Sequence, residues 1–358
     1  MLKNKNWKVS VLIAMIIVFT PILYKGLKPM IFGYDIEKVK TKIGSYLYEK
    51  YGEEFVVDRI GSRNVRGDKE FVARIYPKSI IGTKKEGDIY YYKSTASVDK
   101  IAFGRLGTPG DSYSYIYRND DVEKYLLPKA KEIFGNRVRL KVDVEHKVTG
   151  DGSWWAGYKS KSLEEMREAI KKRPKHNRIE LKLYIYIFDK IDNEAEKEKR
   201  RREIFEYIGY LKKEGLFEYL EMGVIFIDER VLAPSYEEYK EKVEDSDEVE
   251  VEIDGKSVYL PPMKLRKEMS EVLQKEVNEM SEDKLIESME GIQKSDLTYK
   301  KTKYDGQYFK WIYSIKMLEV NYNSAYQEDL KNGNLDCYNY NEISKIDMGE
   351  SLEYIYIN

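Results

Sequence analysis

Two stretches in the middle of the chain alternate between apolar and polar side chains, and this pattern constrains the fold most. The first runs from Arg137 to Val144, with valine or leucine at every even position and charged residues between them. The second runs from Ile179 to Ile187, with isoleucine or leucine at every odd position. Successive side chains of a β-strand point to opposite faces, so both stretches predict strands with one buried and one wet face.

Helical patterns separate these strands. Ser162 and Glu165 form a capping box that opens a short helix, and residues 194–213 predict a charged helix with one apolar side. Met222 to Ile227 is apolar on both faces and predicts a central, buried strand. The order strand–helix–strand–helix–strand across 137–227 predicts one sheet with helices packed on a face.

The preceding part of the chain predicts a helix and at least two strands. Asp35 is placed to cap a helix whose apolar positions are spaced for one face, and Gly52 is placed to end it. Phe55–Ile60 and Glu70–Tyr76 predict strands separated by a turn-rich segment.

The tyrosine-rich stretches at 89–98 and 112–118 are typical of strands, because aromatic residues favour half-buried sheet faces. A helix is expected over 122–134. Pro128 lacks a backbone N–H, so the regular part of this helix is expected to start there.

The C-terminal region predicts a hairpin, a long helix and late strands, and a polar, acidic stretch beginning near Pro234 marks its expected boundary. Asp254-Gly255 lies between two β-prone runs, which is a strong two-residue hairpin signal. Met263 to Met289 predicts one long amphipathic helix. The aromatic segment 308–318 and the last residues, 352–358, are expected to form strands.

Residues Val9 to Tyr24 carry no charge and are more apolar than any later segment. Sixteen helical residues rise about 24 Å, short of the ~30 Å hydrocarbon core of a bilayer. Trp7 and Tyr24 stand at the two ends, where amphipathic rings prefer the membrane interface, and Lys8 and Lys25 can snorkel to extend the span. The segment predicts an uncleaved signal anchor.

Two alternatives to the anchor are a cleaved secretory signal, which would release the protein, and a buried N-terminal core helix. The residues after Thr20 offer no small-x-small cleavage site. Three lysines precede the apolar segment, so the positive-inside rule predicts a cytoplasmic start with the bulk of the chain outside.

Composition argues against several functional classes. Lys and Arg number 62 and Asp and Glu number 63, so no net field attracts nucleic acid, and no nucleic-acid partner is predicted. The single cysteine, Cys337, excludes an internal disulfide, and the two histidines lack the spacing of metal ligands. Because phosphate-loop and dinucleotide motifs are also absent, we predict no cofactor, no metal site and no catalytic residue.

Trp154 and Trp155 are the best candidates for a binding site. Glycines flank them in the segment TGDGSWWAG, and indole faces stack on sugar rings and cations. Asp151 and Glu145 lie close in sequence and could supply carboxylates, which suggests a glycan-directed site. Alternatively, the rings fill a gap in the core or rest on a membrane.

Two charged runs carry weaker hypotheses. The basic run Lys171–Arg178 suits anionic wall polymers or lipid headgroups, or else it is an exposed turn. The acidic stretch Glu237–Asp254 lacks the spacing of a calcium-binding loop, and its interleaved lysines favour a solvated surface.

The sequence therefore predicts an α+β protein in which a transmembrane helix precedes mostly antiparallel or mixed sheets with helices packed on one face. Residues 1–33 hold the anchor, with its apolar core at 9–24 in the lipid bilayer; 34–233 form an ectodomain; 234–358 form a C-terminal region. The expected function is non-catalytic binding or assembly in the cell envelope, with an envelope protein or wall polymer as partner. Alternatives are a glycan-directed hydrolase or binder and a sensor or assembly subunit that docks a partner through helix 263–289.

Overall fold

The computed structural model describes most of the chain after residue 34, and the described residues fall into two compact units that divide between Ile116 and Tyr117. The predicted anchor at 9–24 lies outside the described residues. None of the described helices is both long enough and apolar enough to cross a bilayer. The described residues are 35–65, 68–101, 104–150, 152–157, 162–191, 193–244, 249–253, 256–260, 263–297, 308–314, 316–317, 320, 328 and 331–332.

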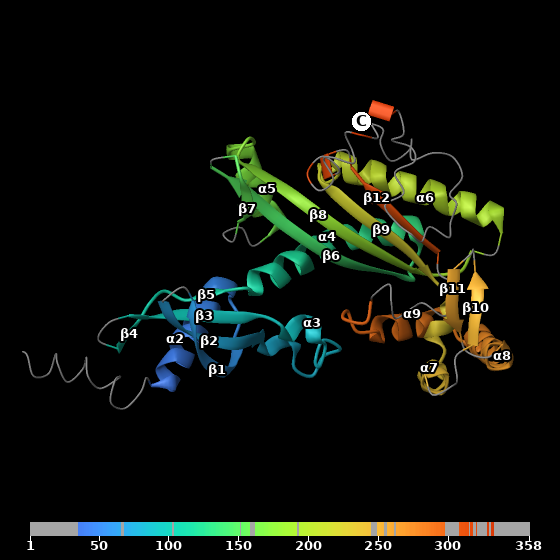
Figure 1. Ribbon diagram of the computed structural model, residues 1–358, viewed down its shortest axis with the longest axis horizontal. Coiled ribbons are helices and arrows are strands. Elements are labelled where there is room, and N and C mark those ends of the chain that lie inside the picture. The colour runs from blue at the N-terminus through green and yellow to red at the C-terminus, as the bar shows by residue number, and fades with distance from the viewer. Residues whose placement is uncertain are drawn as a thin grey trace, which may run out of the picture. The chain divides into compact units, whose positions relative to one another are not determined.

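The first unit packs one helix, α2 (Ile36–Tyr51), on an antiparallel sheet of order β1-β2-β3-β4, in which β5 also pairs with β3 (Figure 1). The predicted helix ends are confirmed, because Asp35 accepts the N–H of Glu37 and Gly52 adopts a left-handed conformation at φ 74°. The strands are β1 (Phe55–Val65), β2 (Asp68–Pro77), β3 (Thr95–Ile101), β4 (Arg105–Leu106) and β5 (Gly110–Asp111).

The strands predicted in the tyrosine-rich stretches are partly wrong. Residues 89–92 form the short helix α3 (Ile89–Tyr92), and β3 begins only at Thr95. Residues 113–118 belong to the helix α4 (Tyr113–Phe134). The physical reason lies in the aspartate before each segment. Asp88 accepts the N–H of Tyr90, and Asp111 accepts that of Tyr113, so each aspartate caps the start of a helix.

Pro128 does not open a helix, contrary to the prediction, because α4 runs through it. Its ring is exposed, while Val122, Leu126 and Ala130 are buried along the other side of the helix. The burial of this apolar stripe outweighs the one backbone hydrogen bond that the proline removes.

The second unit is built on a mixed sheet of order β12-β9-β8-β6-β7, and the α+β class with mixed sheets is confirmed. β8 and β9 are parallel and are joined by the helix α6, whereas the other pairs are antiparallel. The elements are β6 (Val138–Thr149), β7 (Trp154–Ala156), α5 (Leu163–Lys172), β8 (Asn177–Phe188), α6 (Glu194–Lys213), β9 (Leu220–Ile227) and β12 (Tyr308–Tyr313).

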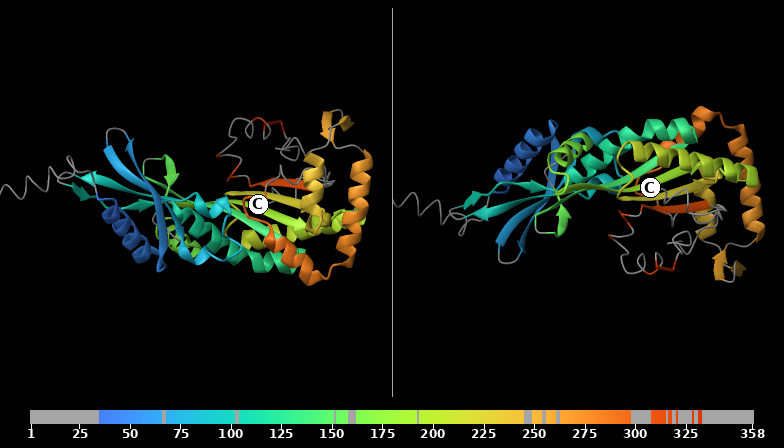
Figure 2. Two further views of the ribbon diagram at one scale, coloured as in Figure 1. Left: turned by 90° about the horizontal axis from the view of Figure 1, so that it is seen from below. Right: turned by 90° about the horizontal axis from the view of Figure 1, so that it is seen from above.

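One face of this sheet is buried over its central strands. The even positions of β6 from Val138 to Val144 and the odd positions of β8 from Leu181 to Ile187 pack in a single core with residues of α4, α5 and α6. Figure 2 shows these three helices along one side of the sheet. The alternation in the sequence therefore predicted both strands and the face that each one buries.

One end of the opposite face is covered by the C-terminal helices. Tyr186, Phe188, Ile225 and Ile227 pack with apolar residues of α8 and α9 and of the short helix η3. A two-stranded hairpin precedes α8 and α9, with Ile253 opposite Lys256 as predicted. The elements are η3 (Glu229–Leu232), α7 (Tyr236–Glu244), β10 (Val249–Ile253), β11 (Lys256–Leu260), α8 (Met263–Glu279) and α9 (Glu282–Gly291).

The single long helix predicted from Met263 to Met289 is two helices, because Ser281 caps a new one by accepting the N–H of Lys284. Leu273 and Val277 of the predicted stripe are buried against the sheet. The boundary predicted near Pro234 falls inside the second unit.

The chain after α9 is held onto the sheet by polar side chains. Arg139 donates to the carbonyls of Met289 and Ile292 at 2.7 and 3.1 Å, and Lys141 donates to that of Leu297 at 3.0 Å. The buried ammonium of Lys294 forms ion pairs with two acidic side chains of α4, at 3.1 Å from Asp120 and 2.5 Å from Glu123. Residues 289–297 are therefore fixed to strand β6 and to α4.

Candidate functional site

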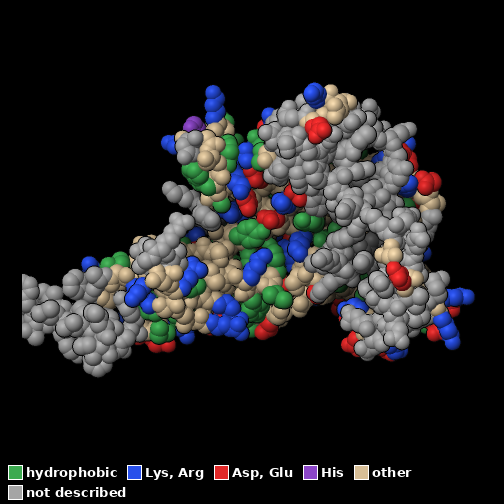
Figure 3. All heavy atoms as spheres, in the orientation of Figure 1, with side chains coloured by type: hydrophobic (Ala, Val, Ile, Leu, Met, Phe, Trp, Pro, Cys, Tyr) green, Lys and Arg blue, Asp and Glu red, His purple; other side chains and the backbone are tan. Residues whose placement is uncertain are grey.

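The other end of this sheet face is charged and partly exposed, and we call it the polar face. Figure 3 shows acidic and basic side chains interspersed on this side of the molecule. Because side chains alternate along each strand, every second residue points to this face, and the strand register places residues of neighbouring strands side by side. The polar face comprises Asp143, Glu145 and Lys147 of β6, Trp154 of β7, Arg178, Glu180, Lys182 and Tyr184 of β8, Glu221 of β9, and Tyr219 just before β9.

Two glutamates lie directly opposite each other in the middle of the polar face. Glu145 of β6 is the register partner of Glu180 of β8, and such like-charged pairs repel. Lys147 forms an ion pair with Glu145 and lies 3.9 Å from Glu180, while Arg178 donates from Nε to Glu180 at 2.8 Å. The two cations offset the repulsion, so these four side chains form one ionic network.

A second group lies one row further along the strands. Lys182 is the register partner of both Asp143 and Glu221, and its ammonium lies 3.0 Å from the Glu221 carboxylate. Burial raises the pKa of Glu221, although the Lys182 ammonium acts in the opposite direction. Oδ1 of Asp143 is buried and accepts no hydrogen bond from the residues that the structure describes.

The indole of Trp154 lies against a cation of the same chain. The guanidinium carbon of Arg178 is 4.2 Å from the centre of the Trp154 ring and 4.6 Å from that of the Tyr219 ring. A guanidinium favours the faces of aromatic rings, and Arg178 also keeps its carboxylate partner Glu180. This stack ties β7, β8 and the start of β9 together.

Of the four residues predicted for a glycan site, the three that the structure describes do not converge. Trp154 and Glu145 share the polar face, but Trp155 pairs with Val148 and points to the opposite face of the sheet. Its side chain is 47% exposed. Asp151 lies outside the described residues. One ring face of Trp154 is taken by Arg178, and Glu145 is bound by Lys147, so these residues do not form a single sugar subsite.

Sequence reasoning missed Glu180, Lys182 and Glu221, and it named Arg178 only as the end of a basic run, not as a neighbour of Trp154. The polar positions between the apolar residues of 179–187 already indicated a wet face on β8. Which charges meet across the sheet depends on strand register and on the parallel pairing of β8 with β9, and neither could be read from one sequence.

His146 is a buried residue on the helix-covered face of the sheet. Its Nε2 lies 3.0 Å from Oδ1 of Asn177, and Gly157 is packed so closely that an added Cβ would lie 3.1 Å from Nδ1. Burial lowers the pKa of His146, the Asn177 contact opposes this, and the charge of Arg118 lowers it further. His146 is therefore a packed core histidine.

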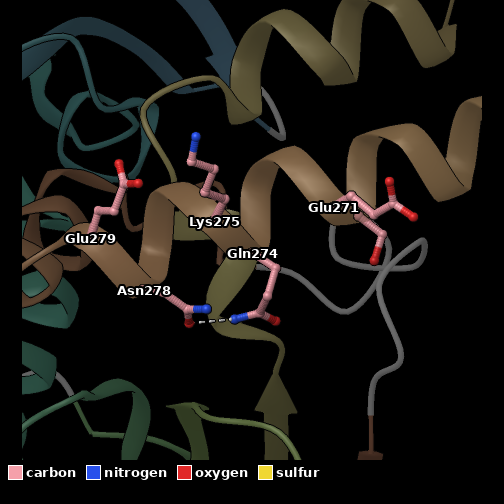
Figure 4. A pocket seen from close by; sticks show the side chains of 6 residues that line it. Glu271, Gln274, Lys275, Asn278 and Glu279 are labelled. Atoms are coloured by element: carbon pink, nitrogen blue, oxygen red, sulfur yellow. Dashed lines mark hydrogen bonds between the residues drawn. The ribbon is translucent and has the colours of Figure 1, made fainter.

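No group of three histidine, cysteine or acidic side chains among the described residues is arranged to hold a metal ion. A shallow hollow occurs on the outer surface of α8, and Figure 4 shows its side chains projecting from that one helix. Gln274 donates to Asn278 there at 3.0 Å. The lining residues are Ser270, Glu271, Gln274, Lys275, Asn278 and Glu279. With a single helix as its wall, this hollow offers no converging catalytic groups.

Comparisons with known proteins identify no family. No protein-family model matches the chain, and no curated protein matches it. One solved structure is similar, a DUF5037 family protein from Ruminococcus gnavus. It is 15% identical, with coverage of 57% of this chain and 79% of the other and a TM-score of 0.31. Similarity at this level does not establish a shared fold or function.

Proposed function

We propose that this chain is a single-pass membrane protein that binds an envelope protein or a wall polymer through its polar face, without catalysis. Residues 9–24 are the membrane anchor and the two units lie outside the cytoplasm. The anchor rests on the uncharged segment between Trp7 and Tyr24 and on the lysines that precede it.

The observation that carries the binding role is the ionic network of the polar face. Glu145, Glu180 and Glu221 each form an ion pair with a neighbouring lysine or arginine. The Lys147–Glu145 pair and the Lys182 ammonium are partly exposed, and exposed ion pairs contribute little to stability, so charged groups of a ligand can replace these contacts at small cost. A surface with both signs of charge in fixed rows selects a partner whose charges are complementary. It also fixes how the partner is aligned on the surface.

We rank the two alternative functions lower for structural reasons. A glycan-directed hydrolase or binder would need Trp155 and Glu145 on one side, whereas they occupy opposite faces of the sheet. A docking helix at 263–289 would need an apolar stripe facing outward, whereas Leu273 and Val277 pack inside the second unit.

Site-specific photo-crosslinking in intact cells tests this proposal. Tyr184 on the polar face is replaced by benzoylphenylalanine, an aromatic residue of related shape, and Phe205 on α6 is replaced in the same way as a matched control. We expect a discrete crosslinked partner from position 184 and none from 205. A Lys147→Glu change should abolish the crosslink from 184, because it reverses one charge of the network. Identical crosslinks from both positions would contradict the proposed binding face.

A further inference from the structure

We propose that one end of the second unit is a basic, tryptophan-bearing surface that binds membranes containing anionic phospholipid. We call this surface the basic tip. It shares no residue with the polar face, and its role does not depend on that face. It consists of Trp155, Lys171, Lys172, Arg173, Lys175 and His176.

Strand pairing brings these residues to one end of the sheet although they come from two separate segments, the strand β7 and the end of α5 with the turn after it. Trp155 is the register partner of Val148, which in turn is the partner of Asn177, so the three lie in one row across β7, β6 and β8. The N–H of Thr149 donates to the carbonyl of His176 at 3.0 Å. The backbone of Trp155 therefore lies two strands from that of Asn177, roughly 10 Å away, and the basic residues 171–176 directly precede Asn177.

The cations of the basic tip are exposed and largely without acidic neighbours. Residues 171–176 are all exposed. Lys171 forms an exposed ion pair with Glu168, whereas Lys172, Arg173 and Lys175 form none with the described residues. Figure 3 shows basic side chains and a histidine standing out at this end. Because the whole chain is nearly neutral, this concentration of positive charge is local.

Trp155 adds an apolar group to the same surface. It lies on the three-residue strand β7, and Gly152 in the loop before it adopts a left-handed conformation at φ 94°. An exposed indole costs free energy in water and is favoured at the membrane–water interface, where its ring lies at headgroup level.

The pairing of an exposed indole with adjacent cations points to a lipid surface rather than to a soluble phosphate polymer. Cations attract the phosphate groups of lipids and of soluble polymers alike. Only a bilayer also has an interfacial layer in which an aromatic ring is favoured. Lipid binding by such surfaces needs two signals, and the basic tip supplies one electrostatic and one apolar.

Vesicle flotation tests the proposal with the full chain. The protein is held in nanodiscs of phosphatidylcholine, so that its own anchor is occupied, and is mixed with vesicles of phosphatidylcholine alone or with added phosphatidylglycerol. We expect the nanodiscs to float only with the anionic vesicles, and added salt to weaken the binding. Equal flotation with neutral vesicles would overturn the proposal.

Charge reversal distinguishes the basic tip from a general charge effect. The triple variant K172E/R173E/K175E should bind anionic vesicles about 100-fold more weakly or worse, because three favourable charges become repulsive. Trp155→Ala should weaken binding about tenfold with its charges intact. The matched control K264E/K267E/K284E changes three exposed lysines of α8 and α9 by the same net charge and should bind as the wild type does.

Two further outcomes would overturn the proposal. Loss of binding in the α8–α9 control as large as in the tip variant would show that only net charge matters. Displacement of the vesicles by soluble polyphosphate at equal phosphate concentration, with no effect of Trp155→Ala, would identify a phosphate polymer as the occupant.

Discussion

The phenol of Tyr51 donates a hydrogen bond to Oδ1 of Asp111 at 2.7 Å, and the ammonium of Lys50 lies 2.6 Å from Oδ2 of the same carboxylate. Tyr46 donates to Oδ2 at 2.7 Å, and the N–H of Tyr113 donates to Oδ1 at 2.9 Å. The Asp111 side chain has no exposed surface. One carboxylate therefore joins α2 to β5 and to the first turn of α4.

Asp111→Ala should lower the free energy of unfolding of the first unit by about 3 kcal/mol or more, because it leaves a partly buried ammonium and two phenols without their acceptor. Urea denaturation followed by circular dichroism measures this change. Glu49→Ala, an exposed acidic position on the same helix, should change stability by less than about 0.5 kcal/mol. Similar effects of the two changes would show that Asp111 does not hold α2 in place.

Glu221→Gln should become more stable relative to the wild type as the pH rises. Burial raises the pKa of Glu221, so the folded state favours the protonated acid, and stability is lost as the pH rises from the unfolded value of about 4.3 through the folded pKa. Denaturation midpoints of the two proteins from about pH 4 to about pH 7 test the trend. Glu218→Gln, at an exposed position three residues earlier, should follow the wild type at every pH.

His146→Gln should remove an acid-dependent loss of stability in the second unit. The pKa of His146 is lowered by burial and by Arg118, so stability falls as the pH drops below about 6.5 and towards the folded pKa. The melting temperature of the wild type should therefore fall more than that of the variant between about pH 7 and about pH 5. His176→Gln changes the other, exposed histidine and should keep the wild-type pH dependence.

Arg178→Lys should lower the free energy of unfolding by about 1–2 kcal/mol although it keeps the charge, because an ammonium lacks the planar guanidinium that contacts the rings of both Trp154 and Tyr219. Denaturant titration measures the loss, and the near-ultraviolet circular dichroism should change as the indole loses its neighbour. Arg202→Lys, an exposed arginine of α6, is the control and should be nearly neutral. An unchanged Arg178→Lys protein would show that the stack contributes nothing.

Membrane topology can be tested through the single cysteine. In a Cys337→Ser background, a cysteine replacing the exposed Lys264 should react with a membrane-impermeant maleimide in intact cells. A cysteine replacing Leu2 should react only after permeabilisation, because the positive-inside rule keeps the start in the cytoplasm. The reverse labelling would invert the orientation, and protein found in the medium would favour the cleaved signal.

Sequence patterns predicted those helices and strands that bury one face and expose the other. The alternation ending at Val144 and Ile187 identified β6 and β8, because a half-buried strand requires that period. The errors occurred where a polar cap decides the structure. Asp111 turns a tyrosine-rich run into the start of α4, and Ser281 divides one amphipathic pattern into two helices.

The candidate site could be predicted only in part. Trp154 and Glu145 were identified from the local sequence around TGDGSWWAG, and both lie on the polar face. Their decisive neighbours, Arg178 and Glu221, come from strands that are distant in sequence and meet them only through register. Trp155 was predicted to share a site with Trp154. Adjacent residues of a strand point to opposite faces, so the two indoles lie on different sides of the sheet.

The covering of the sheet by α8 and α9 has a consequence for how the protein is made. Tyr186, Phe188, Ile225 and Ile227 are synthesised before residues 263–291, which bury them. Until those helices have left the ribosome, a growing chain presents an apolar sheet surface with nothing to cover it, and such surfaces aggregate. Translation stalled or truncated before Met263 would therefore give an insoluble product, so soluble protein forms only after the segment that contains α8 and α9 has been synthesised.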